Sequence, residues 1–89
     1  HLTDGFDVEL IREYRKTIAT IDGVETVKDV RARSYGNNAV VDVVITVRSD
    51  LDMHQAHDIC TDVEDELLRE HDVYTVHVHV EPEMWEESV

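Results

Sequence analysis

Two segments of the chain alternate between apolar and polar residues with a period of two, and this pattern restricts the fold more than any other feature. In residues 73–81 every second residue is apolar, and the polar positions between them are Thr75, His77, His79 and Glu81. In residues 39–48 one set is Val41, Val43, Ile45 and Val47, and the other is Val40, Asp42, Val44 and Thr46. Successive side chains of a strand point to opposite faces of a sheet. Both segments are therefore predicted to be strands with one face buried against another layer.

Two further segments carry apolar residues at three- and four-residue spacing, which predicts amphipathic helices. The first helix is expected over residues 7–21, with Gly23 just past its end, and its apolar positions are Phe6, Leu10, Ile11, Tyr14, Ile18 and Ile21. The second is expected to begin at Asp52, where Gln55 completes a capping-box pattern, and to end near His71. Its apolar stripe is Ala56, Ile59, Cys60, Val63 and Leu67.

A Val-rich segment over residues 24–34 predicts one more strand, and Gly36, Asn37 and Asn38 supply turn residues for a hairpin between it and residues 39–48. The resulting order is α-β-β-α-β, an α+β fold with a three-stranded sheet. Two helices can cover only one face of such a sheet. The other face is therefore predicted to be open, either to solvent or to a partner.

The length and charge of the chain limit its organisation and its partners. The 89 residues are expected to form one domain over residues 1–82, followed by an acidic tail over 83–89. A formal charge of −13 argues against nucleic acid and anionic lipid as partners and suits the attraction of cations. Cys60 is the only cysteine, so no intrachain disulfide can form. No stretch approaches the ~20 apolar residues of a membrane span, although spans upstream of residue 1 are compatible with this sequence.

The candidate chemistry lies on the open face of the predicted sheet. If the apolar set of the last strand faces the helices, His77, His79 and Glu81 form a row on the opposite face, and Asp42 shares that face by parity. Imidazole and carboxylate together suit zinc and other borderline divalent cations. The simpler alternative is that these histidines are merely tolerated polar residues of an exposed strand. His54 and His57, three residues apart at the start of the second helix, form a further possible pair.

Sequence motifs of several enzyme classes are absent. The chain has no glycine-rich phosphate loop, no Gly-x-Ser-x-Gly and no Cys-x-x-Cys. Cys60 falls in an apolar stripe and is interpreted as part of the core. The chain is therefore expected not to be an enzyme, and the role of Trp85 in the tail stays open.

Residues 23–82 resemble the C-terminal domain of the cation diffusion facilitator family. Four stretches carry this resemblance: Gly23-Val24-Glu25-Thr26-Val27 followed by Asp29-Val30-Arg31-Ala32-Arg33; Gly36 before the strand Val40–Val47; Leu51-Asp52-Met53-His54-Gln55-Ala56-His57; and Val78-His79-Val80-Glu81-Pro82. The helix start and the strand ending are specific only in combination. The resemblance, together with the first helix, covers about nine-tenths of the chain.

The resemblance implies a ferredoxin-like α-β-β-α-β domain that forms a V-shaped homodimer on the cytoplasmic face of a membrane. Its partners would be divalent cations, a second copy and the transmembrane domain of its own parent, a metal-cation efflux transporter. Carried over by position, the metal ligands would be His57, His79 and Glu81, with Asp42 completing the site in one branch of the family. Lys28 and Val44 stand where zinc members carry histidine, so zinc, manganese, iron, cobalt and nickel all stay open.

Two other functions are compatible with the residues. One is a free-standing metal buffer or chaperone of the same fold. The other is a ferredoxin-like small-molecule sensor or enzyme subunit, which would need a glycine-rich ligand loop that the three glycines do not form. Under the leading hypothesis the domain binds a divalent cation and thereby tightens the homodimer, without needing the cation in order to fold.

Overall fold

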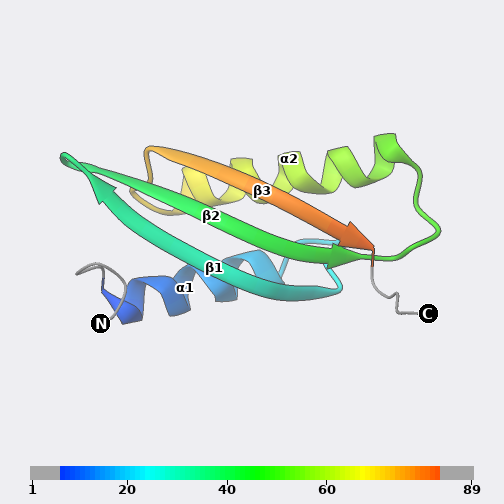
Figure 1. Ribbon diagram of the computed structural model, residues 1–89, viewed down its shortest axis with the longest axis horizontal. Helices are drawn as coiled ribbons and strands as arrows, with labels where there is room; N and C mark the ends of the chain where they lie inside the picture. Colours follow the sequence, from blue (N-terminus) through cyan, green and yellow to red (C-terminus); the bar gives the residue numbers. More distant parts are fainter. Residues whose placement is uncertain (1–6, 83–89) are drawn as a thin grey trace.

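The computed structural model describes residues 7–82 and has the predicted α-β-β-α-β order. Its elements are α1 (Val8–Ala19), β1 (Thr26–Tyr35), β2 (Asn38–Val47), α2 (Met53–Glu70) and β3 (Thr75–Pro82). The sheet order is β1-β2-β3, with β1 antiparallel and β3 parallel to the central strand. Both helices lie behind the sheet in Figure 1, α1 along β1 and α2 along β3. The expected α+β fold, with two helices on one face of three strands, is therefore confirmed.

Local sequence signals explain where the elements begin and end. The side chain of Asp52 accepts a hydrogen bond from the backbone N–H of Gln55, and the Gln55 side chain accepts one from the backbone N–H of Asp52, which completes the predicted capping box. Asp7 caps α1 in a similar way, by accepting from the Glu9 amide. Gly36, with a φ of 64°, begins the two-residue connection of the β1–β2 hairpin. Left-handed backbone of this kind is what glycine adopts at low cost.

The core lies between the sheet and the two helices. Its buried residues are Tyr14, Ile18, Val30, Ala32, Val41, Val43, Ile45, Val47, Ile59, Val63, Leu67 and Val76. All four predicted inward positions of β2 belong to this set, so the parity of that strand is confirmed. Ala56 and Cys60 of the predicted α2 stripe are only half-buried, at its edge. No helix within residues 7–82 is long and apolar enough to cross a membrane.

Two expectations about apolar residues were wrong. Leu10 was expected in the buried stripe of α1 but is 42% exposed, because it borders an open hollow beside the hairpin instead of the core. The face opposite the helices was expected to be open, which would expose Val40 and Val44 of the second set in that strand, yet Val40 is only 5% exposed and Val44 is half-buried. In the strand register Val40 lies between Arg33 and Thr75, and Val44 lies between Asp29 and His79. Phe6 and the tail 83–89, including Trp85, lie outside the described residues.

Candidate functional site

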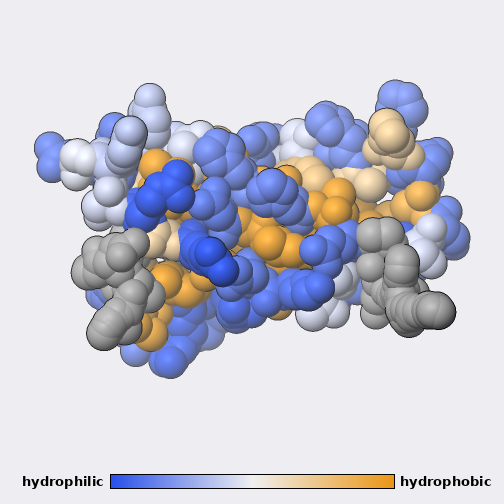
Figure 2. Space-filling model, in the orientation of Figure 1, coloured by the Kyte–Doolittle hydropathy of each residue, from blue (hydrophilic) through white to orange (hydrophobic). Residues whose placement is uncertain are grey.

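The open face of the sheet brings Asp42 and His77 into contact. Parallel pairing of β2 with β3 sets these two residues directly opposite each other, and His77 Nδ1 lies 3.1 Å from Asp42 Oδ1. On the other side, Arg33 Nη1 of β1 donates to Asp42 Oδ2 over 2.9 Å. The Asp42 carboxylate therefore has one oxygen engaged by each neighbouring strand. Figure 2 shows this face, where hydrophilic side chains cross the apolar residues of the sheet.

The charge state of Asp42 follows from these contacts. Partial burial alone would raise the pKa of its carboxyl group, but the hydrogen bonds and charges of His77 and Arg33 outweigh burial and lower the pKa. Asp42 is therefore ionised at neutral pH. An ionised carboxylate beside an imidazole is a donor pair that suits a divalent cation.

The other two candidates on this face, His79 and Glu81, occupy the next positions along β3. His79 lies opposite Val44, and Glu81 lies opposite Thr46. Glu81 Oε1 is engaged by Lys28 Nζ, 2.7 Å away, so the lysine side chain reaches across the central strand. Both candidate carboxylates, Asp42 and Glu81, are thus paired with a cation from β1.

His57 does not join this group, because it is an exposed residue of α2, the helix that covers the opposite face of the sheet. Within residues 7–82, no group of three or more His, Cys, Asp or Glu side chains is arranged to hold a metal ion. One copy of the domain therefore offers the two-residue pair Asp42–His77. Any further ligands must come from water, from side-chain rearrangement or from a second copy.

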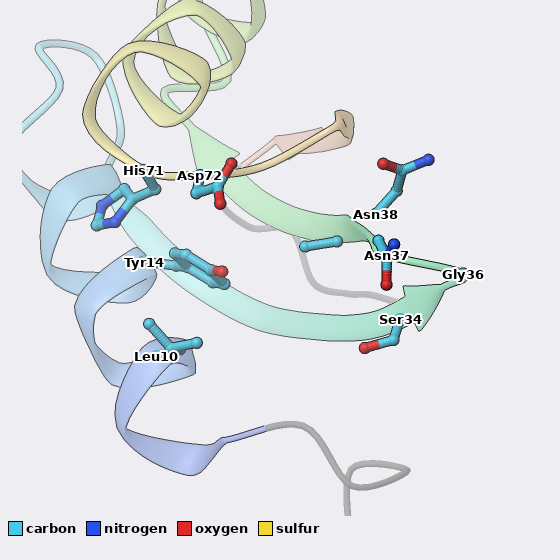
Figure 3. A pocket seen from close by; sticks show the side chains of 9 residues that line it. Leu10, Tyr14, Ser34, Gly36, Asn37, Asn38, His71 and Asp72 are labelled. Atoms are coloured by element: carbon cyan, nitrogen blue, oxygen red, sulfur yellow. The ribbon is translucent and has the colours of Figure 1, made fainter.

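A hollow beside the β1–β2 hairpin is lined by Tyr14 and His71, titratable side chains whose contacts indicate a structural role. Figure 3 shows Tyr14, His71 and Asp72 beside the hairpin residues Asn37 and Asn38. His71 Nε2 shares a 2.8 Å hydrogen bond with Thr17 Oγ1, and its ring contacts the edge of Tyr14 at 5.0 Å and 86°. Burial, reinforced by Asp72, raises the pKa of Tyr14 and keeps the phenol neutral. His71 thus joins the end of α2 to α1.

An apolar groove lies where β2, β3 and the start of α2 meet. It is lined by Val47, Arg48, Ser49, Leu51, Asp52, Met53, Ala56 and Val80. Met53 is 85% exposed and Val80 is 36% exposed. An exposed methionine beside other apolar side chains is typical of surfaces that contact another protein.

The interactions of Arg33 and Lys28 with the candidate ligands were not predicted. The strand register was available in principle, because a two-residue turn at Gly36 and Asn37 pairs Tyr35 with Asn38 and hence Arg31 with Asp42. That register points to Arg31 as the partner of Asp42, but Arg31 Nε donates to Asp29 over 3.0 Å instead. The strand register shifts at a bulge between Val27 and Asp29, where Lys28 extends toward β3. No sequence pattern predicts this bulge.

Comparisons with known proteins agree with this fold and with the resemblance. Residues 6–83 match the family described as "Cation efflux protein, cytoplasmic domain". The manganese efflux system protein MneS of Bacillus subtilis (strain 168) is 44% identical over 81 residues, which are 91% of this chain and 28% of MneS. The manganese efflux system protein MneP of the same organism is 38% identical over 77 residues, or 85% of this chain and 26% of MneP. The chain thus spans just over a quarter of the length of these relatives.

Solved structures of the MamM C-terminal domain share the fold. One is 26% identical with a TM-score of 0.76 and covers 85% of this chain and 99% of that domain. A variant of the same domain with one histidine replaced by alanine reaches a TM-score of 0.79 at 24% identity, covering 88% of this chain and 100% of that domain. The match of residues 6–83, together with these relatives, establishes that the chain belongs to the cation efflux family, in which it corresponds to the cytoplasmic domain.

Proposed function

We propose that this chain is the regulatory domain of a divalent-cation efflux transporter, that it binds the cation on the open face of its sheet, and that binding tightens a homodimer. The contact between Asp42 and His77 carries this proposal, since it joins an ionised carboxylate to an imidazole on an accessible face. The role is regulatory and not catalytic. The remaining parts of the transporter, including its membrane spans, would lie outside this chain.

Manganese is the cation that the relatives favour, since two of them are named manganese efflux proteins. The donor atoms are compatible with this choice, because oxygen and nitrogen ligands without thiolate accept Mn²⁺ as well as zinc, iron, cobalt or nickel. Divalent cations at such a site follow a general order in which Mn²⁺ binds most weakly. Nickel and zinc should therefore bind more tightly than manganese in a test tube.

The pattern of substitutions in the MamM domain supports His77 as the partner of Asp42. Variants of that domain replace an aspartate, two histidines and a glutamate. The aspartate precedes the first histidine by fifteen positions, as Asp42 precedes His57, and the second histidine precedes the glutamate by four positions, as His77 precedes Glu81. We therefore propose Glu81 and His57 as further ligands, with His57 contributing from the side of α2, whereas this spacing matches no residue to His79.

The dimer is proposed to form through the apolar groove at Met53. Each copy would be one arm of the V-shaped dimer, with its open face turned toward the other copy. Val40 and Val44 are too well covered to drive association, whereas Met53 and Val80 are exposed. Each copy carries a charge of −13, so two copies repel each other, and a divalent cation bound between them offsets part of that charge. The cation therefore favours the closed arrangement of the dimer.

Calorimetric titration of the metal-free domain with Mn²⁺ and Ni²⁺ tests the cation site. Binding should be lost or reduced at least tenfold in Asp42→Ala and in His77→Ala, and should weaken as the pH falls, because imidazole ligates only when neutral. His54→Ala, a change of the same kind on the exposed start of α2, serves as the control and should leave affinity unchanged. Unchanged affinity in both open-face variants would refute the assignment.

Light scattering at micromolar concentration tests the dimer. The wild-type domain should have twice the mass of the chain, and Met53→Glu should shift it to a monomer, because a buried carboxylate is costly at an apolar contact. Tyr35→Glu, at a residue that is 71% exposed near the hairpin, is the matched control and should stay dimeric.

A free-standing metal buffer is disfavoured by the relatives, of which this chain spans only 28% and 26%.

A further inference from the structure

One cation from β1 is paired with each of the two candidate carboxylates, Asp42 and Glu81. Arg33 Nη1 lies 2.9 Å from Asp42 Oδ2, and Lys28 Nζ lies 2.7 Å from Glu81 Oε1. Neither contact simply follows the strand register, since Arg33 lies opposite Val40 and Lys28 lies two strands away from Glu81. The two candidate carboxylates of this face are therefore paired with the domain's own cationic side chains.

The pairing of Asp42 bears most directly on cation binding. Its Oδ1 is engaged by His77 and its Oδ2 by Arg33, so an incoming cation would have to share a carboxylate whose charge is already partly offset by the guanidinium. A divalent ion between Asp42 and His77 would also lie within a few ångströms of the guanidinium, and like charges at that separation repel each other. A bound cation is therefore expected to loosen the contact between Arg33 and the carboxylate.

The exposure of Arg33 makes such a movement feasible. Its side chain is 51% exposed, whereas that of Asp42 is 30% exposed. Ion pairs at such accessible positions contribute little to stability, because water and salt screen them. The need to release the Arg33–Asp42 pair should therefore weaken cation binding measurably without preventing it.

We propose that Arg33 sets the affinity of the site by competing with the cation for Asp42. This inference rests on the proposed function, because it concerns the regulation of the same site. The intramolecular ion pair raises the cation concentration at which the domain responds. A domain with this property stays unliganded at low cation concentration and responds only to an excess.

Arg31 provides a control within the same strand. It lies opposite Asp42 in the register, but its guanidinium pairs with Asp29 and its side chain is 80% exposed. Arg31→Gln and Arg33→Gln change the net charge of the domain equally. A difference between them therefore reports the contact with Asp42 and not the general electrostatic field of the domain.

The test is calorimetric titration with Mn²⁺ of the wild-type domain, Arg33→Gln, Arg33→Lys and Arg31→Gln, each checked for folding by thermal unfolding. Arg33→Gln should lower the Kd about three- to tenfold, as expected for release of an exposed pair and of the accompanying repulsion. Arg33→Lys, which keeps the charge, should stay closer to wild type than Arg33→Gln does, and Arg31→Gln should change the Kd less than about twofold. In an Asp42→Asn background, Arg33→Gln should no longer tighten binding.

The outcomes separate the inference from the proposed function. If the wild-type domain binds Mn²⁺ and Arg33→Gln binds it equally or more weakly, the competition is refuted while the cation site stands. Tightening that persists in the Asp42→Asn background also overturns the inference. If neither the wild-type domain nor any variant binds a divalent cation, the proposed function itself fails, and the inference fails with it.

Discussion

The two faces of strand β2 differ sharply although their residues alternate along one segment of chain. Val41, Val43 and Ile45 face the helices and are 0% exposed, whereas Asp42, Val44 and Thr46 face the open side and are half-buried. The inward residues belong to the hydrophobic core, while Asp42 is held by polar partners from both adjacent strands. Burial of apolar side chains is thus concentrated on one face of the strand, and the other face carries charged groups such as Asp42.

The largest effect should come from the same substitution made on each face of this strand. Val43→Ala removes buried methyl groups and leaves a cavity in the core, so it should lower the free energy of unfolding by about 2–4 kcal/mol. Val44→Ala, at the next residue, should lower it by less than about 1 kcal/mol, because its side chain is only partly covered. Denaturant unfolding of the metal-free domain measures both losses. Equal losses would show that the two faces of β2 contribute equally to stability.

Gly23 gives a second measure of how tightly the helix-covered side is packed. A Cβ atom at this position would lie 2.5 Å from Ile59 Cδ1, and the φ of Gly23 is +99°, where side chains are rarely tolerated. Gly23→Ala should therefore cost about 2 kcal/mol of stability, from the strained backbone and the overpacked contact together. Gly36→Ala has positive φ but open space around it, so it should cost less. A reversed order in thermal unfolding would show that the α1–β1 connection adapts easily.

On the open face, the effect of Asp42 on stability should be small and dependent on pH. Its carboxyl pKa is lowered in the folded state, so the ionised form contributes stability above the ordinary carboxyl range, and this contribution is lost as the pH falls through the lowered value. In metal-free protein at pH 7, Asp42→Asn should cost less than about 1 kcal/mol. The difference from wild type should shrink below about pH 4. A difference that grows in acid would contradict this sign.

The sequence was sufficient for the features that depend on local periodicity. Alternation in residues 39–48 and 73–81 assigned Asp42 and His77 to one face, and Asp52 with Gln55 marked the start of α2. The exposure of Leu10 and the coverage of Val40 depend on tertiary packing that no periodicity encodes. The choice of Arg33 over Arg31 as the partner of Asp42 depends on how two long side chains turn, which the strand register leaves open.

The complete ligand set is beyond the reach of sequence reasoning for a different reason. His57 lies on α2, the helix that covers the other face from Asp42 and His77, so a site that includes all three needs a second copy or a rearrangement. Periodicity describes the faces of one copy only. How two copies would meet depends on surfaces such as the groove at Met53, which forms only in the folded chain.

Paramagnetic broadening of amide signals by substoichiometric Mn²⁺ tests the central claim most directly, because it locates the bound ion without any substitution. If the cation binds on the open face, the amide signals of residues around Asp42 and His77 should weaken first, followed by those near His79 and Glu81. The competing location is the hollow between α1 and α2 that is lined by Asp22, Asp62, Asp65 and Glu66. Early loss of signals around that hollow, with those of Asp42 and His77 unaffected, would contradict the assignment of the cation site to the open face.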